Sequence, residues 1–307
     1  MRFAVIDLGT NTFNLLIAEK GNASSINILH EKKLPVKLGE GGMVRKRITP
    51  EAWERGINAI DDHLKAIRQS NVSEIVAYAT SATRNAENGK EFVDEILKRF
   101  GIKVNVIDGE SEAEYIYYGV RQVLPLGDGV SLIMDIGGGS NELILGNAQQ
   151  VFWMQSFDLG VSRLLQIFNP SNPIIPDEVQ RIEVFFEKEL QPFFKAVEKF
   201  SPDKLVGSSG SFDTYRSMLT KAGILPSSKG FSIEIPVNHY YDLHHRLLKS
   251  TREERLKMDG LEPMRADFIV LASLFTNFIL KRSGVIRMYQ SSFALKEGAL
   301  WKILFSD

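Results

Sequence analysis

Short apolar stretches alternate along the chain with longer stretches in which apolar residues recur every three or four positions. The first pattern is typical of buried strands and the second of amphipathic helices. Strands are predicted at residues 3–6, 15–18, 26–29, 34–38, 74–79, 104–107, 132–135, 204–206 and 285–288. Helices are predicted from 49 to about 67 and around 92–100, 110–123, 176–200, 212–220, 239–248, 264–280 and 293–304. The alternation predicts an α/β fold with domains of residues 1–124 and 125–307.

The composition removes several classes of protein from consideration. The 307 residues include no cysteine, so disulfides and thiolate metal sites are excluded. No apolar run approaches the roughly 20 residues of a membrane span, and Asp7 comes too early for a signal peptide, so we expect a soluble, cytoplasmic protein. A net charge of −1 argues against broad nucleic-acid binding. It leaves room for a phosphorylated ligand, because backbone amides and a cation can balance the charge.

The most informative feature is an internal repeat. The segment from Asp7 to Ala18 aligns without gaps with the segment from Asp135 to Gly146, at a constant offset of 128 residues. Each segment follows an apolar strand and begins with Asp, an apolar residue and Gly. A turn of small polar residues and a second apolar strand come next. Such turns present backbone amides and hydroxyls outward, so two of them facing each other would hold consecutive phosphates. The alternative is a pair of ordinary glycine-containing turns. The candidate phosphate-binding residues are Gly9, Thr10, Asn11, Thr12, Gly137, Gly138, Gly139 and Ser140.

Three carboxylates accompany the two turns. Asp135 and Glu142 lie on opposite arms of the second hairpin, where both can converge at its mouth, and Asp7 comes from the first hairpin. Hard oxygen ligands of this kind suit Mg²⁺, which keeps several waters and shares phosphate oxygens. We therefore predict Mg²⁺ as the cofactor, with Asp135, Glu142 and Asp7 as its ligands. The alternative for Asp135 is a hydrogen bond to the backbone of its own turn.

The two Asp-x-Gly loops resemble those of the actin, Hsp70 and sugar-kinase superfold. Further segments carry a closer resemblance to the exopolyphosphatase and guanosine pentaphosphate phosphohydrolase family, in the right order along almost the whole chain. They are Ala79–Arg84, Gly109–Ala113, Val206–Ser211, Arg265–Asp267 and Lys296–Gly298. The chain departs from that family at Glu114, where a basic residue is common, and at Ser292 and Ala294, where Asp and Gly are usual.

The resemblance implies two duplicated actin-like ATPase (ribonuclease H-like) domains that flank a central cleft, with the last helix packing back on the first domain. It implies Glu112 as the catalytic acid that positions water and Arg84 as a substrate-facing arginine; a helix-terminus charge and an interdomain salt bridge are the respective alternatives. It also implies a third substrate-binding loop with Gly207, Ser209, Gly210 and Ser211, and a contact from Arg265, for which a structural pair with Asp267 is the alternative.

The expected substrates are inorganic polyphosphate, guanosine pentaphosphate or both. Two competing hypotheses are an ATP-dependent kinase or ATPase of the same superfold and a non-catalytic sensor of polyphosphate or nucleotide. A homodimer is a further expectation, because the 264–280 helix is apolar enough to need cover.

Overall fold

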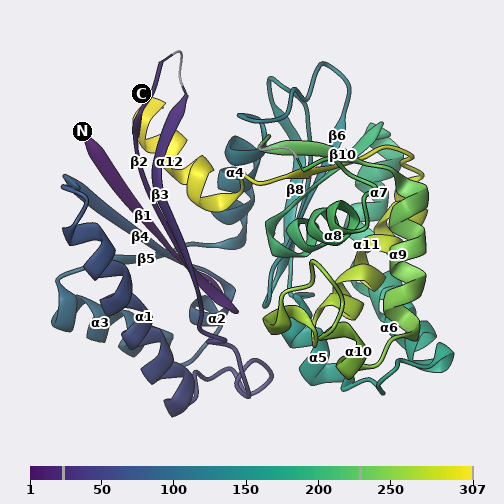
Figure 1. Cartoon of the computed structure of the whole chain (residues 1–307), viewed down its shortest axis with the longest axis horizontal. Coiled ribbons are helices and arrows are strands. Elements are labelled where there is room, and N and C mark those ends of the chain that lie inside the picture. The colour runs from purple at the N-terminus through teal and green to yellow at the C-terminus, as the bar shows by residue number, and fades with distance from the viewer. Residues whose placement is uncertain (23–24, 228–229, 306–307) are drawn as a thin grey trace.

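The computed structural model describes residues 1–22, 25–227 and 230–305, and two separate sheets divide them into two lobes. Figure 1 shows the lobes side by side, with helices α4 and α12 between them. We call the lobe built on the five-stranded sheet the first lobe and the lobe built on the six-stranded sheet the second lobe. No helix in the described ranges is long and apolar enough to cross a membrane.

The first lobe has strands in the order β3-β2-β1-β4-β5. They are β1 (Arg2–Leu8), β2 (Thr12–Lys20), β3 (Ile26–Pro35), β4 (Glu74–Ala79) and β5 (Val104–Val106). Its helices are α1 (Pro50–Arg68), α2 (Ser81–Arg84), α3 (Gly89–Phe100) and α4 (Gly109–Val120). The predicted cap of α1 is confirmed: the Thr49 side chain accepts a hydrogen bond from the Ala52 amide.

The second lobe has strands in the order β10-β11-β9-β6-β7-β8. They are β6 (Ser131–Ile136), β7 (Asn141–Gly146), β8 (Val151–Phe157), β9 (Lys204–Ser208), β10 (Ser232–Ile235) and β11 (Met288–Ser291). Its helices are α5 (Val161–Phe168), α6 (Pro176–Glu189), α7 (Gln191–Phe200), α8 (Ser209–Lys221), α9 (Val237–Lys249), α10 (Arg252–Arg255), the 3₁₀ turn η1 (Pro263–Arg265) and α11 (Ile269–Ser283).

The two sheets repeat one topology. β1 pairs with β2 antiparallel and with β4 parallel, and β6 pairs with β7 antiparallel and with β9 parallel. β4 then pairs with β5, and β9 with β11, again in parallel. The central strands are apolar on both faces, which matches sheets covered by helices or chain on each side. The repeat in the sequence therefore corresponds to equivalent hairpins at the centre of each sheet.

Helices α4 and α12 (Leu295–Phe305) join the lobes and pack closely against each other. Glycine makes this contact possible on both helices. A Cβ atom at Gly298 would lie 1.7 Å from the Tyr115 carbonyl oxygen, and one at Gly119 would lie 2.1 Å from the Ala294 carbonyl oxygen. α12 also contacts β1 and β2, so the end of the chain returns to the first lobe (Figure 1).

Some predicted elements differ from the structure. The single helix predicted over 176–200 is two helices, α6 and α7, that meet at Leu190. Pro192 has no amide hydrogen and fits the first turn of α7 but not the interior of a longer helix. The strand predicted at 26–29 and the start of the one predicted at 34–38 belong to one edge strand, β3, which ends at Pro35, so residues 36–38 lie outside it. The helix predicted from residue 264 begins at Ile269, after the turn η1.

Candidate active site

The two repeated hairpins end in loops with the same geometry. The Gly9 amide donates to the Thr12 carbonyl at 3.1 Å, and the Gly137 amide donates to the Ser140 carbonyl at the same 3.1 Å. In the strand register, Asp7 lies opposite Asn14 and Asp135 lies opposite Glu142. The repeat therefore preserves the turn, whereas the residue opposite each Asp differs.

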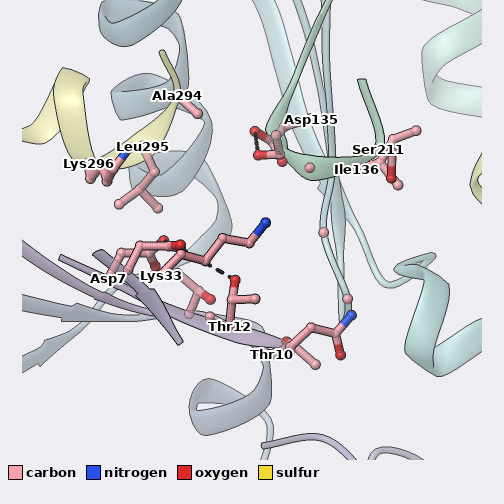
Figure 2. Close-up of a pocket in the computed structure, with 18 of the residues that line it drawn as sticks. Asp7, Thr10, Thr12, Lys33, Asp135, Ile136, Ser211, Ala294, Leu295 and Lys296 are labelled. Carbon is pink, nitrogen blue, oxygen red and sulfur yellow. Dashed lines mark hydrogen bonds between the residues drawn. The ribbon is translucent and has the colours of Figure 1, made fainter. Parts of the chain in front are cut away.

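The two loops face each other across a cavity of about 500 Å³ between the lobes. Figure 2 shows Asp7, Thr10 and Thr12 on one wall and Asp135, Ile136 and Ser211 on the other. Fifteen of the predicted site residues line this cavity. They are Asp7, Gly9, Thr10, Asn11, Thr12, Glu112, Asp135, Gly137, Gly138, Gly139, Ser140, Ser209, Gly210, Ser211 and Arg265.

Three predicted site residues lie behind the cavity wall rather than among the described residues that line it: Arg84, Glu142 and Gly207. Gly207 packs in the core, since a Cβ there would lie 2.0 Å from the Phe212 ring. Glu142 accepts a hydrogen bond from the Ser156 hydroxyl at 2.6 Å, beneath the second loop. These residues support the site from behind.

Glu112 lies in the first turn of α4, where Asp108 caps the helix by accepting from the Ser111 amide. Its carboxylate accepts a hydrogen bond from Arg84 Nη1 at 2.9 Å, and the same nitrogen donates to the Ile107 carbonyl. Burial raises the pKa of Glu112 to about 7, although Arg84 opposes the shift. A carboxylate with this pKa is suited to accept a proton near neutral pH. Arg84 therefore holds Glu112 by a salt bridge within the predicted first domain, whereas the alternative was a salt bridge between domains.

The other acids of the site are held mainly by neutral donors. Asp135 accepts hydrogen bonds from the Ser208 and Ser209 hydroxyls at 2.7 and 2.5 Å. Asp7 accepts one from the Asn14 side-chain amide at 2.9 Å. Burial raises the pKa of Asp7 to about 6 and also raises the pKa of Asp135. Glu142 has a pKa well above its usual value, because it is buried and lies near Glu112 and Asp135.

The charges that line the cavity favour a cation. The acidic side chains are Asp7, Glu31, Glu112, Asp135, Asp213 and Glu297, and the basic ones are Lys32, Lys33, Arg265 and Lys296. Across the described ranges, no three acidic or histidine side chains come together as a ready-made metal site. This donor set fits Mg²⁺, which binds through one or two carboxylates and completes its shell with water and phosphate oxygens. Asp135 and Asp7 are the lining carboxylates that come from the two loops.

The third loop lies where β9 passes into α8. Ser209 has a left-handed backbone, with φ of 66°, and directs its hydroxyl at Asp135. A Cβ atom at Gly210 would lie 1.5 Å from Arg265 Nη2, so glycine is required for the guanidinium to lie against this loop. Arg265 thus reaches the cavity from η1 by packing on the first turn of α8.

Several lining residues carry charge that was not assigned from the sequence. Lys33 comes from β3 and Lys296 from α12, and Asp213 lies one turn into α8. Lys296 binds Glu31 at 3.0 Å and also contacts Glu297. Lys296 could have been predicted as a site residue, because its segment, 296–298, belongs to a motif of the resembled family. No sequence pattern marked Lys33 as a site residue, because a lysine on an edge strand is ordinary.

A duplicated two-lobe fold, facing phosphate loops and a buried acid between them define an enzyme that acts on phosphoryl groups. The chain matches the Ppx/GppA phosphatase family over residues 16–306 and belongs to that family. Exopolyphosphatase 1 of Mycobacterium tuberculosis is 28% identical over 310 residues, which span 100% of this chain and 89% of that protein.

Two solved structures show the same two actin-like domains. The exopolyphosphatase from Cytophaga hutchinsonii is 37% identical with a TM-score of 0.96, and the match covers 99% of this chain and 98% of that one. The Ppx/GppA family member of Aquifex aeolicus is 27% identical with a TM-score of 0.82, and the match covers 99% and 97%. The expected fold class and family are therefore confirmed.

Proposed function

We propose that this protein is an exopolyphosphatase, which releases terminal orthophosphate from inorganic polyphosphate. The observation that carries the proposal is the position of Glu112, on the wall of the cavity that is also lined by the two glycine-containing loops. The relatives named as exopolyphosphatases support the same substrate.

In the proposed reaction, Glu112 orients a water molecule and takes its proton. The water oxygen forms a bond to the terminal phosphorus while the bridging P–O bond breaks, and the shortened chain leaves with the electron pair of that bond. The amides of the two loops hold the phosphates in line, which is the main requirement of phosphoryl transfer. Arg84 acts through Glu112, because it fixes the carboxylate from behind.

Mg²⁺, held by Asp135 and Asp7 together with phosphate oxygens, would neutralise charge on the transferring group. The lining acids outnumber the lining bases, which makes such a cation necessary before a polyanion enters. Ser208 and Ser209 direct the Asp135 carboxylate, and Asn14 directs that of Asp7.

The test is phosphate release, in the presence of Mg²⁺, from long-chain polyphosphate, guanosine pentaphosphate and ATP. We expect release from polyphosphate, and a loss of about 10²–10⁴-fold in Glu112→Gln, the range that a general base contributes. Glu110→Gln is the matched control, since Glu110 is exposed one position before Ser111 on the same helical turn.

Each other outcome has a definite meaning. Phosphate release from guanosine pentaphosphate alone would show that this nucleotide, and not polyphosphate, is the substrate. ADP formation that depends on an acceptor would replace the hydrolase with a kinase. An unchanged rate in Glu112→Gln would remove Glu112 from the mechanism, and tight binding without any turnover would favour a sensor.

A further inference from the structure

The cations that line the cavity differ in how firmly they are already bound. Lys32 binds Asp62 at 2.7 Å, and Lys296 is held by Glu31 and Glu297. The Lys296 side chain is 18% exposed and its partner Glu297 is fully buried, so this pair is fixed in place. Lys33 and Arg265 pair with Glu262, which at 53% is the most exposed of the carboxylates bound to the lining cations, so they are the cations most available to a polyanion.

Lys33 and Arg265 share one acidic partner from outside the cavity lining. Glu262 Oε2 accepts from Lys33 Nζ at 3.1 Å and from Arg265 Nε at 3.0 Å. Lys33 belongs to the first lobe, on β3, whereas Glu262 and Arg265 belong to the second lobe, at η1. A single carboxylate oxygen therefore accepts from two cations and links the lobes across the cleft.

The Lys33 side chain already points into the site. Figure 2 shows it extending from the first-lobe wall towards the wall with Asp135 and Ser211. The Arg265 guanidinium lies against Gly210, and both residues line the same cavity. The two cations thus approach one space from opposite lobes.

We propose that Glu262 is a displaceable counterion that competes with the phosphate chain for Lys33 and Arg265 and so sets the enzyme's affinity for polyphosphate. This inference rests on the proposed function for the identity of the chain. When the chain enters, its oxygens replace the Glu262 carboxylate on both cations, and the substrate then links the lobes. Glu262 thereby disfavours ligands with too few charges to displace it.

Exposure decides which partner is displaced. The Glu262 side chain is 53% exposed, against 35% for Lys33 and 18% for Arg265. An exposed ion pair contributes little net stability, so the carboxylate returns to water at small cost. A phosphate carries more charge and offers Arg265 two parallel acceptors, which makes it the stronger partner.

The test measures binding of inorganic tripolyphosphate by calorimetry, in a Glu112→Gln background so that the ligand is not consumed. We expect Glu262→Gln to lower the Kd about 1.5- to fivefold, the range of an exposed ion pair. Lys33→Met should raise the Kd, and Glu262→Gln should then have a smaller effect, because the two residues are coupled. Glu253→Gln and Lys103→Met, both at exposed positions, are the matched controls.

Kinetics with polyphosphate should agree: in the otherwise unmodified enzyme, Glu262→Gln lowers KM with kcat nearly constant. A Kd that is unchanged or raised by Glu262→Gln would overturn the proposal, because the carboxylate would then orient the cations instead of competing for them. If the unmodified enzyme releases no phosphate from polyphosphate but Glu262→Gln still tightens tripolyphosphate binding, the proposed function fails and the counterion role stands.

Discussion

The two repeated hairpins share a backbone and differ in the residue that lies opposite each Asp. In the first, Asp7 lies opposite Asn14, whose amide donates to it at 2.9 Å. In the second, Asp135 lies opposite Glu142, so two carboxylates face each other across one strand pair. Serine hydroxyls from β8, β9 and α8 reach these two acids.

Because of this difference, the acids at equivalent positions of the two hairpins have different electrostatic surroundings. Asp7 already has a donor and lies near Lys296, whose positive charge favours its ionised form. Asp135 and Glu142 accept hydrogen bonds from serine hydroxyls, and the pKa of Glu142 is raised first by burial and then by the charges of Glu112 and Asp135. We therefore propose that, if a cation binds, the second hairpin relies on it more than the first, although both loops bind phosphate in the proposed mechanism.

The largest expected effect comes from removing one charge from each hairpin in turn. Asp135→Asn should raise the Mg²⁺ concentration for half-maximal activity by at least about 100-fold, the upper range for weakened metal sites. Asp7→Asn should raise it only about tenfold, because Asn14 and Lys296 already compensate that acid. Magnesium titrations of phosphate release measure both. Equal shifts would show that the hairpins share the cation evenly and would remove the asymmetry.

The sequence predicted the paired hairpins well, because a strand, a turn and a strand are local features. The register that places Glu142 opposite Asp135 followed from the spacing within one hairpin. The shared 128-residue offset then placed both loops on one cleft, as the matching strand topologies show.

The side chains that tune the site were harder to predict, because they arrive from distant parts of the chain. Ser156 comes from β8 and Lys33 from the edge strand β3, and neither position has a local pattern that marks it. Arg84 was expected to face the substrate, yet it binds Glu112, which lies 28 residues further along the chain. Such pairings depend on tertiary packing, which one sequence does not display.

A second, smaller effect is expected from making the first hairpin acidic like the second. Asn14→Asp would replace the donor to Asp7 with a like charge in a buried place, so one of the two acids must stay protonated. The free energy of unfolding should fall by about 1–3 kcal/mol. Denaturant unfolding at pH 7.5 measures this, with Asn238→Asp, at an exposed position on α9, as the control. Unchanged stability would mean that the first hairpin tolerates paired acids as the second does.

The smallest expected effect is a pH dependence of stability in the absence of divalent cations. Burial raises the pKa of Glu112 to about 7 and the pKa of Glu142 well above normal, whereas unfolded glutamates titrate near 4.5. Between those values the folded state binds more protons, so these groups make stability fall as pH rises through the window up to about pH 7. Buried His63 and His244, with pKa values lowered to about 4 by burial, act in the opposite direction up to about pH 6.5.

Comparing the native chain with Glu142→Gln removes the histidine contribution, because both proteins contain it. The melting temperature of the native chain should fall relative to that of Glu142→Gln as pH rises from 5 to 8, and saturating Mg²⁺ should reduce the difference by compensating the second-hairpin acids. If the difference between the two proteins changes with pH in the same way with and without Mg²⁺, Glu142 keeps its proton throughout this range in the folded state. In that case the two hairpins would carry the same charge after all, and Asp135 alone would create the demand for a cation. Parallel curves for the native chain and Glu142→Gln would instead mean that the pKa of Glu142 is not raised, which would contradict the prediction.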